Sequence, residues 1–279
     1  MPELPEVEVM RRDLDKEVVG KKVKSVEVTG MRSIRRYRQR KQFTAALEGR
    51  KFTGVERRGK YLLVKLEGGD VLVIHLGMSG QLRRAAGTKE AVAKHTHVTI
   101  TFTQGGQLRF IDPRTFGEMF VTSLDGIENE VEELAHLGID PLESAMSWDY
   151  FGELVARRHA KLKLALMDQK FLAGIGNIYS DEILHHAGLR WDRMSDTLRP
   201  EQIRRLYRAV VEVLQDGVKY RGSSLADEQY VDLFGRKGGY QDHHQVYARE
   251  GLSCKRCRRE IVREKVAGRS TFFCPYCQV

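Results

Sequence analysis

The chain has 279 residues, of which 41% are hydrophobic and 30% are charged, and this length can bury the cores of two domains. The composition excludes a collagen, a disordered tail and a membrane-spanning protein, because no apolar run approaches the roughly 20 residues that cross a bilayer. The start MPELPEVE is acidic where a secretory signal is basic, so we expect a cytoplasmic protein that does not bind membranes.

The formal net charge of +9 is distributed unevenly along the chain. Residues 31–60 hold eleven basic and two acidic side chains, residues 245–279 hold eight and three, and residues 124–150 hold eight acids without a Lys or Arg. A polyanion that contacts both basic segments would release condensed counterions at each phosphate. The alternative is the solvated face of an ordinary basic protein.

The N-terminal half predicts one helix followed by strands. Pro5 opens the helix, apolar side chains follow at helical spacing, and Gly20 ends it. Apolar runs bounded by turn residues then predict strands at residues 26–28, 61–66, 71–76, 98–102 and 108–111. We therefore expect an antiparallel β-sandwich or barrel with a leading helix.

The C-terminal half changes to helical periodicity after an acidic stretch, residues 124–140, which is the best linker candidate. Helices are predicted at residues 148–157, 161–169, 177–186 and 200–216. The stretch 221–240 is rich in Gly, Ser and Asp without a sustained period, which predicts a long loop. Together the two halves predict an α+β fold.

Two Cys-x-x-Cys pairs near the C-terminus give the most specific local signal. They are separated by sixteen residues and consist of Cys254, Cys257, Cys274 and Cys277. This spacing is typical of tetrahedral thiolate coordination of zinc, and four protein ligands leave no open position for catalysis. Disulfide pairing is the alternative, and a reducing cytosol disfavours it. We expect one structural Zn²⁺ that holds a two-stranded hairpin with cationic side chains.

The segment 172–177, LAGIGN, resembles a Gly-rich phosphate loop but lacks a third glycine and a preceding strand. We interpret it as a tight turn between two helices, with Asn177 as N-cap of the second and free amides directed at one phosphate. A helix-turn-helix corner without a ligand is the alternative.

The N-terminus has a chemical use if Met1 is removed, which the small Pro2 permits. Removal would expose a secondary amine beside the carboxyl group of Glu3. An α-amino group has a pKa of roughly 8 against about 10.4 for lysine, so a larger fraction is nucleophilic at pH 7. The amine of proline is somewhat more basic, so a neighbouring cation such as Lys60 would have to help lower its pKa. In the alternative interpretation, Pro2 and Pro5 only shape the helix entry.

These features together resemble the formamidopyrimidine-DNA glycosylases, with endonuclease VIII as sister group, over essentially the whole chain. Six segments match in order: MPELPEVE at the start, RRGKY at 57–61, HLGMSG at 75–80, DPRTFG at 112–117, GIGNIY at 174–179, and the cysteine ribbon with AGR at 267–269. The resemblance implies a bifunctional DNA glycosylase and apurinic/apyrimidinic lyase for base-excision repair. Such an enzyme excises 8-oxoguanine and formamidopyrimidines from double-stranded DNA and cuts abasic sites.

The resemblance also implies catalytic roles. Pro2 would attack the C1′ carbon and form a Schiff base, Glu3 would act as acid/base, and Glu6 would assist in the same pocket. Lys60 would contact a phosphate beside the lesion, and Arg269 would clamp the backbone around the extruded nucleotide. Successive β and δ eliminations would then cut the strand.

Further DNA contacts are carried over from the same resemblance. Lys163 and Asn177 would hold phosphates, and His95 would also contact DNA. Met78 and Phe116 would fill the gap left by the flipped nucleotide while Arg114 pairs with the orphaned cytosine. Without the resemblance, Met78 and Phe116 read as core residues at strand ends.

The implied organisation is an N-terminal catalytic β-sandwich domain (1–125), an acidic linker (126–146), a helix-two-turn-helix DNA-binding domain with a lesion-covering loop (147–240) and a zinc-ribbon finger (245–279). We expect a monomer in the bacterial cytoplasm, associated with the nucleoid when bound to DNA. The loop 223–240 differs in length from some relatives, so base preference is the least determined property. The alternatives are an endonuclease VIII-like enzyme for oxidised pyrimidines and a catalytically idle zinc protein that binds lesions or gaps.

Overall fold

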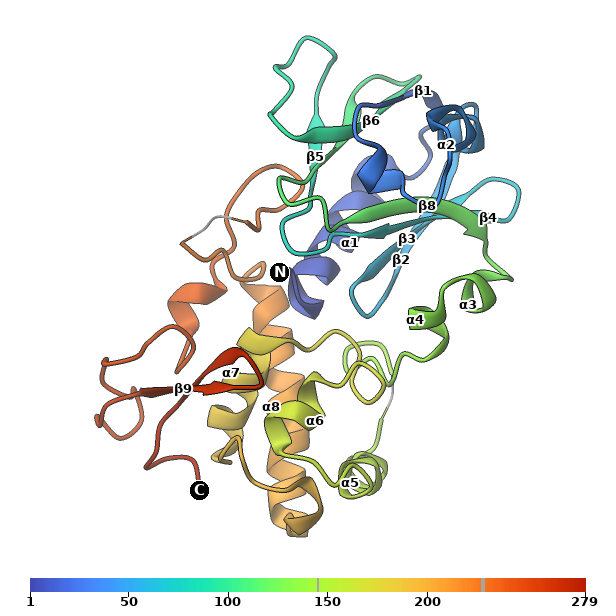
Figure 1. Cartoon of the computed structure of the whole chain (residues 1–279). Helices are drawn as coiled ribbons and strands as arrows, with labels where there is room; N and C mark the ends of the chain where they lie inside the picture. Colours follow the sequence, from blue (N-terminus) through green and yellow to red (C-terminus); the bar gives the residue numbers. More distant parts are fainter. Residues whose placement is uncertain (145, 227–228) are drawn as a thin grey trace. The chain divides into compact units, whose positions relative to one another are not determined.

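The chain divides into two compact units, which are described separately (Figure 1). The structure is a computed structural model that describes residues 1–144, 146–226 and 229–279. Unit 1 comprises Met1–Ala135 and Tyr220–Gly239, and unit 2 comprises His136–Lys219 and Tyr240–Val279. The domain boundaries drawn from the sequence stay a prediction. That prediction grouped residues 220–239 with the helical domain, whereas in the structure they belong to unit 1. No helix among the described residues has the length and apolarity that a bilayer crossing needs.

Unit 1 contains two four-stranded antiparallel sheets and a leading helix (Figure 1). The sheets have the strand orders β1-β6-β7-β5 and β2-β3-β4-β8. The strands are β1 (Val23–Val28), β2 (Phe52–Arg58), β3 (Tyr61–Leu66), β4 (Asp70–His75), β5 (Gln81–Ala85), β6 (Thr96–Phe102), β7 (Gln107–Ile111) and β8 (Glu118–Ser123). The helical elements are α1 (Leu4–Val18), η1 (Met31–Ile34), α2 (Arg40–Leu47), α3 (Ile127–Glu130) and α4 (Glu132–Ala135). The predicted helix and sandwich are confirmed, and the acidic stretch contains the short helices α3 and α4.

Helix α1 is positioned by its apolar face. Val7, Met10, Leu14 and Val18, at the spacing that predicted the helix, are all buried in one core with side chains of both sheets. Burial of this stripe fixes the rotation of the helix, because apolar side chains removed from water each contribute roughly 1.5–3 kcal/mol. The residues at the start of α1 are therefore held against a rigid sandwich.

Unit 2 is helical and ends in a two-stranded ribbon (Figure 1). Its elements are α5 (Trp148–Ala156), α6 (Leu162–Met167), α7 (Asn177–Ala187), η2 (Ser195–Thr197), α8 (Pro200–Lys219), η3 (Tyr240–His243), β9 (Val262–Val266) and β10 (Arg269–Phe273). All four predicted helices are confirmed. In the ribbon Val266 pairs with Arg269, which leaves a two-residue turn at Ala267 and Gly268 whose φ angles are 47° and 78°. This backbone matches the right-handed twist of an antiparallel pair and presents Arg269 at the ribbon's tip.

Candidate active site and zinc centre

The start of α1 places two buried carboxylates next to Pro2. Glu3 is the N-cap of α1 and forms a capping box with Glu6, in which the backbone N–H of Glu3 donates to Oε2 of Glu6 at 2.8 Å. Both carboxylates are almost completely buried, as is Pro2, whereas Met1 is 51% exposed. The sequence thus folds here by local capping, and the same contacts bring together Pro2, Glu3 and Glu6 as predicted.

Glu6 also contacts the segment 220–239. Its Oε1 accepts the backbone N–H of Ser223 at 2.8 Å, and Arg221 forms an ion pair with Asp13 of α1. Gly222 has a φ of +77°, and a Cβ there would lie 2.8 Å from Cγ of Glu6, so only glycine fits between segment and helix. The predicted loop therefore begins beside the carboxylates, and its residues 227–228 lie outside the described chain.

Lys60 lies in the hairpin turn between β2 and β3. Arg58 pairs with Tyr61, which leaves Gly59 and Lys60 as the turn, with Gly59 at a φ of +55°. The ring of Tyr61 stacks on that of His75, with a centroid separation of 4.6 Å. Burial, and next the positive charge of Lys60, lower the pKa of His75 to about 4. The Lys60 turn thus lies beside a histidine that stays neutral.

The neutral His75 predicts an acid sensitivity of unit 1. Its ordinary pKa is about 6.5, so between pH 6.5 and pH 4 the unfolded chain binds a proton that the folded chain does not. The free energy of unfolding is expected to fall as pH drops through this window, by up to about 3 kcal/mol. Urea unfolding of wild type and His75→Gln at pH 7.5 and pH 5 checks this. Equal pH dependence of the two proteins would contradict it.

Met78, Arg114 and Phe116 lie on two loops that buried polar groups join. Oδ1 of the fully buried Asp112 accepts the hydroxyl of Ser79 at 2.5 Å and the backbone N–H of Arg114 at 3.2 Å. Met78 is 39% and Phe116 49% exposed, and the Arg114 guanidinium lies 5.4 Å from the Phe116 ring centroid. The structure excludes the interpretation of Met78 and Phe116 as core residues. Exposed apolar side chains on anchored loops are suited to insertion between bases.

His95 lies close to the same loops. It is exposed, has a φ of 63°, and its carbonyl accepts the backbone N–H of Asp112 at 3.0 Å. Its position is compatible with a DNA contact, which stays a prediction.

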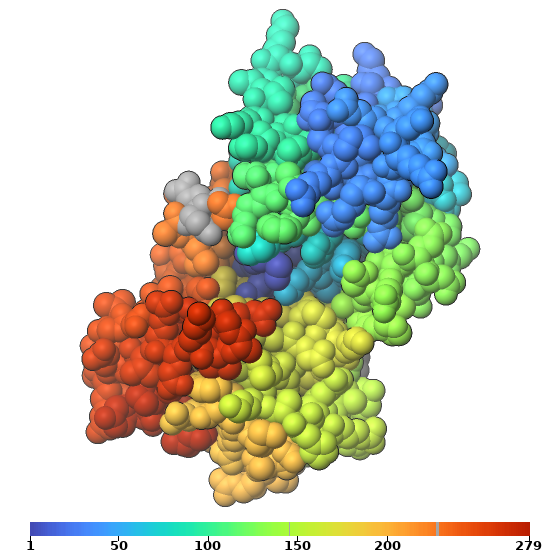
Figure 2. Space-filling model, in the orientation of Figure 1, coloured from blue at the N-terminus to red at the C-terminus, as the bar shows by residue number. Residues whose placement is uncertain are grey.

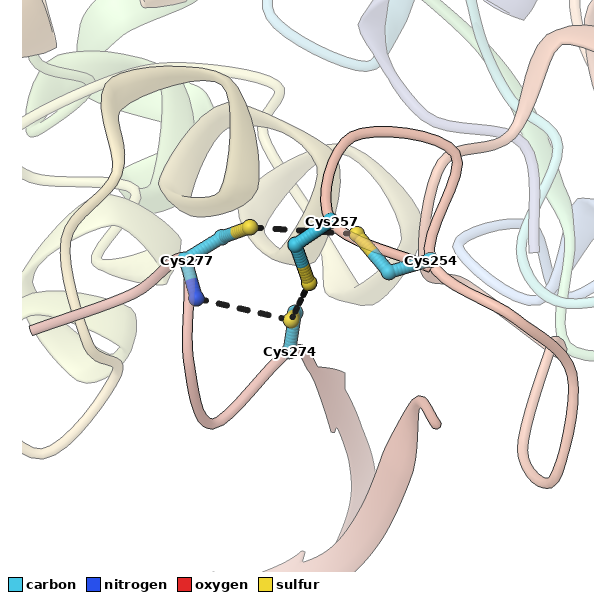
Figure 3. A group of neighbouring side chains, drawn as sticks. All are labelled: Cys254, Cys257, Cys274 and Cys277. Atoms are coloured by element: carbon cyan, nitrogen blue, oxygen red, sulfur yellow. Dashed lines mark hydrogen bonds between the residues drawn. The ribbon is translucent and has the colours of Figure 1, made fainter. Parts of the chain in front are cut away.

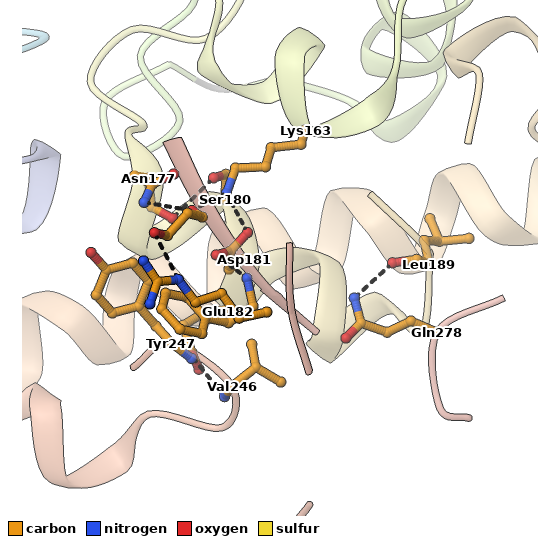
Figure 4. Close-up of polar contacts among 12 residues, drawn as sticks. Lys163, Asn177, Ser180, Asp181, Glu182, Leu189, Val246, Tyr247 and Gln278 are labelled. Atoms are coloured by element: carbon orange, nitrogen blue, oxygen red, sulfur yellow. Dashed lines mark hydrogen bonds and ion pairs between the residues drawn. The ribbon is translucent and has the colours of Figure 1, made fainter. Parts of the chain in front are cut away.

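In unit 2, the two predicted phosphate ligands Lys163 and Asn177 bond the same carbonyl group (Figure 4). The carbonyl oxygen of Ser270 accepts Nζ of Lys163 at 3.3 Å and Nδ2 of Asn177 at 3.0 Å, and Arg269 is the preceding residue. Nζ of Lys163 also pairs with Asp181 at 2.6 Å, and both side chains are 1% exposed. Lys163 is therefore buried in an ion pair, while Arg269 is exposed.

The prediction of Asn177 as an N-cap is wrong. The N-cap of α7 is Gly176, and Asn177 is the first helical residue. Its side chain crosses to the ribbon instead of bonding its own helix. The sequence alone could not decide which of the two neighbours, Gly176 or Asn177, caps the helix, because both residue types are common N-caps.

The four cysteines form a site that fits zinc (Figure 3). Their sulfur atoms lie within 4.8 Å of one another, with Cys257 to Cys274 at 3.5 Å and Cys254 to Cys277 at 3.9 Å. Tetrahedral Zn–S bonds of about 2.3 Å require S···S separations of about 3.8 Å. The backbone N–H of Cys277 points at Sγ of Cys274 at 3.4 Å, a donor that stabilises thiolate. The geometry agrees with one structural zinc.

Helix α7 anchors the ribbon through three side chains that sequence reasoning missed. Asp181 accepts the backbone N–H of Phe272 at 2.9 Å, and His185 places Nε2 3.6 Å from Sγ of Cys254. Glu182 accepts three consecutive backbone N–H groups, from residues 245–247 (Figure 4). Burial raises the pKa of Asp181 to about 7, while the Lys163 ammonium opposes the rise. The sequence signal that could have indicated these contacts is the acidic pair Asp181 and Glu182 in a helix with an apolar pattern.

The two basic segments lie in different units, and many of their side chains are exposed. In the space-filling view, residues 31–48 (blue) lie at the surface of unit 1, and residues 251–279 (red) lie at the surface of unit 2 (Figure 2). In the first segment, Arg35 and Arg36 pair with Glu118, and Arg58 pairs with Glu128, so acids offset part of its charge.

The comparisons with known proteins cover the whole chain. The family models that match are the formamidopyrimidine-DNA glycosylase N-terminal domain (residues 1–119), the formamidopyrimidine-DNA glycosylase H2TH domain (137–229) and the zinc finger found in FPG and IleRS (251–279). The chain is 42% identical to the formamidopyrimidine-DNA glycosylase of Pelotomaculum thermopropionicum and 44% identical to that of Thermus thermophilus. These matches cover 100% of this chain and 99% and 98% of the relatives.

Solved structures agree with the same assignment. The MutM (Fpg) protein from Thermus thermophilus superimposes with a TM-score of 0.88 at 42% identity, covering 99% of this chain and 98% of that one. The Lactococcus lactis Fpg in complex with DNA containing an abasic site gives 0.90 at 36% identity, covering 99% of both.

Pro2 beside two buried carboxylates, together with a cysteine ribbon anchored to a helical unit, defines the class of a zinc-ribbon DNA repair glycosylase. The chain belongs to the formamidopyrimidine-DNA glycosylase family.

Proposed function

We propose that the protein is a base-excision repair enzyme that removes oxidised purines from duplex DNA and cleaves the resulting abasic site. The observation that carries this proposal is the start of α1, where Pro2 adjoins the buried carboxylates of Glu3 and Glu6. The relatives support the substrate class, since the Lactococcus lactis Fpg has been solved with DNA containing Fapy-dG and with DNA containing an abasic site.

The proposed reaction begins after removal of Met1. The Pro2 nitrogen forms a bond to C1′ of the extruded nucleotide as the bond from C1′ to the base breaks. The base leaves with the bonding electrons and takes up the proton that the Pro2 nitrogen loses. Glu3 protonates the ring oxygen as the sugar opens, which leaves an iminium ion on Pro2. Loss of a C2′ proton expels the 3′-phosphate, and a second elimination expels the 5′-phosphate. The positive charge on Pro2 accepts electrons in both eliminations.

Separate groups would hold the DNA. Lys60 contacts a phosphate beside the lesion, and Lys163, Asn177 and Arg269 hold or orient phosphates from unit 2. His95 adds a contact from unit 1. Met78 and Phe116 fill the vacated space, and Arg114 pairs with the orphaned base. The zinc is structural: it keeps the ribbon folded so that Arg269 is presented, and it takes part in no chemical step.

Borohydride trapping tests the proposal. Reduction of the iminium ion is expected to yield a covalent protein–DNA adduct with duplexes that carry 8-oxoguanine or an abasic site. A catalytically idle lesion-binding protein would bind both duplexes without an adduct. A parallel duplex with thymine glycol tests substrate choice, and removal of thymine glycol alone would favour the endonuclease VIII-like alternative. The anchored Met78, Arg114 and Phe116 favour the oxidised purine.

The site of action follows from the substrate. Because chromosomal DNA lies in the bacterial cytoplasm and the relatives are bacterial, we propose action there as a monomer, on the nucleoid when bound to DNA.

A further inference from the structure

A fully buried guanidinium lies on the core side of β2. Arg57 lies between the exposed Glu56 and the half-buried Arg58 and shares its face with the buried Val55, so its position is one where a strand usually carries an apolar side chain. Its side chain is 0% exposed. A buried cation at a core position is expensive unless it is paired and hydrogen-bonded.

Arg57 makes contacts in two directions. Its Nε donates to Oε2 of Glu8 on α1 at 3.1 Å, and its Nη1 donates to the carbonyl oxygen of Gly59 at 3.1 Å. Gly59 is the first residue of the turn that carries Lys60. One planar group therefore links the helix that follows Pro2 to the turn of Lys60.

The partner acid is fixed in its charged form. Burial disfavours the carboxylate of Glu8, but hydrogen bonds from Arg11, Arg12 and Arg57 outweigh this and lower its pKa to about 2. Arg11 bonds Glu8 at 3.0 Å through two nitrogens, and Arg12 bonds it at 2.7 Å. The link is thus charged throughout the physiological range.

Stability is a weak explanation for such a pair. The desolvation of two buried charges offsets most of their attraction, and well-packed apolar replacements are frequently as stable. What an apolar pair cannot do is hold a carbonyl group and a carboxylate at once, in one plane and at fixed distances. Geometry is therefore the property that the buried guanidinium supplies.

We propose that Arg57 is a positioning residue that fixes the Lys60 turn relative to the start of α1, and so sets Lys60 with respect to Pro2 and Glu3. The inference rests on the proposed function, in which these three residues act on the same nucleotide. A guanidinium offers five N–H donors in a rigid fork, whereas a lysine ammonium is a point charge on a flexible chain. Lysine at position 57 would keep the charge and lose the double contact.

The first test is Arg57→Lys, measured as the rate constant of borohydride trapping with an abasic duplex. A small displacement of a catalytic group costs up to about a hundredfold, so we expect a loss of about 10–100-fold. Arg11→Lys is the matched control, because Arg11 bonds the same carboxylate of Glu8, whereas the Gly59 carbonyl accepts from Arg57. Arg11 is partly exposed, and the trapping rate of its variant is expected to stay within about twofold of wild type.

The second test shows whether Arg57 acts through Lys60. Lys60→Ala is introduced into wild type and into Arg57→Lys, and coupled residues give effects that do not add. We expect Lys60→Ala to slow trapping far less in the Arg57→Lys background than in wild type. A purely structural role of Arg57 would give additive losses, which would overturn the inference.

A third variant separates positioning from folding. Glu8→Leu combined with Arg57→Met replaces the buried pair by apolar side chains of similar size, and we expect it to unfold near the wild-type temperature while trapping as poorly as Arg57→Lys. Wild-type trapping rates in both variants would refute the inference and leave the proposed function intact. If wild type itself yields no adduct, the proposed function fails, and the inference fails with it.

Discussion

A chain in which a lysine is inserted between Met1 and Pro2 is expected to give no borohydride-trapped adduct, a loss of at least about a thousandfold. The large second residue blocks removal of Met1, so the nitrogen of Pro2 stays in an amide and cannot attack C1′. The new terminal amine is displaced by two residues from the capping box of Glu3 and Glu6. Gel shift after reduction measures the adduct, and intact-mass analysis verifies the retained residues.

The same experiment contains its own control. A version with a protease site before Pro2 is inactive until cleavage exposes the proline, and cleavage is expected to restore trapping. Pro2→Gly is expected to suppress it, because a primary amine forms an imine that can lose its charge, whereas the proline iminium cannot. A fully active enzyme that still carries Met1 by mass would contradict the assignment of Pro2.

The parts of the site that sequence predicts well are those built from neighbouring residues. Glu3 and Glu6 are three positions apart at a helix start, where capping forces their side chains together. The Cys-x-x-Cys pairs are similar, because each knuckle fixes two ligands locally and one metal joins the knuckles. In such cases the spacing of the residues in the sequence determines how close their side chains lie in the structure.

The contacts that sequence could not predict join side chains far apart in the chain. Ser79 and Asp112 belong to two loops whose proximity depends on the pairing of β5 with β7. Arg57 belongs to the basic segment 31–60, which is interpreted from the sequence as a phosphate-binding surface. In the structure its side chain lies instead on the face of β2 that is buried in the core. Alternation defines two faces of a strand, and only packing decides which of them is buried.

Lys163 is a second residue whose burial the sequence could not predict. The family motif marks it as a phosphate ligand, yet the structure buries its ammonium against Asp181 and the Ser270 carbonyl. A direct DNA contact of Lys163 stays a prediction. What the geometry supports is a role in holding the strand that begins at Arg269, because breaking a buried ion pair leaves a costly unpaired charge.

Loss of the metal is expected to weaken DNA binding about 10–100-fold while leaving unit 1 folded. The ribbon has a small apolar core of its own: Val246, Cys254, Ile261, Phe272 and Cys274. Without zinc this core is too small to offset the entropy of ordering two strands, so the turn that presents Arg269 melts. Pro2 and its carboxylates belong to unit 1, whose core does not include the ribbon.

Cys274→Ser tests this with a reporter built into the chain. The protein has two tryptophans, and Trp191 lies against Phe273 of β10 with ring centroids 6.5 Å apart. In a Trp148→Phe background, the fluorescence of Trp191 is expected to shift to longer wavelength when Cys274→Ser or a chelator removes the metal, in step with the loss of affinity for an abasic duplex. The melting of unit 1 and the capacity of Pro2 for trapping at saturating DNA are expected to persist. Undiminished binding by protein that elemental analysis shows to be free of metal would mean that the ribbon presents its cations without zinc.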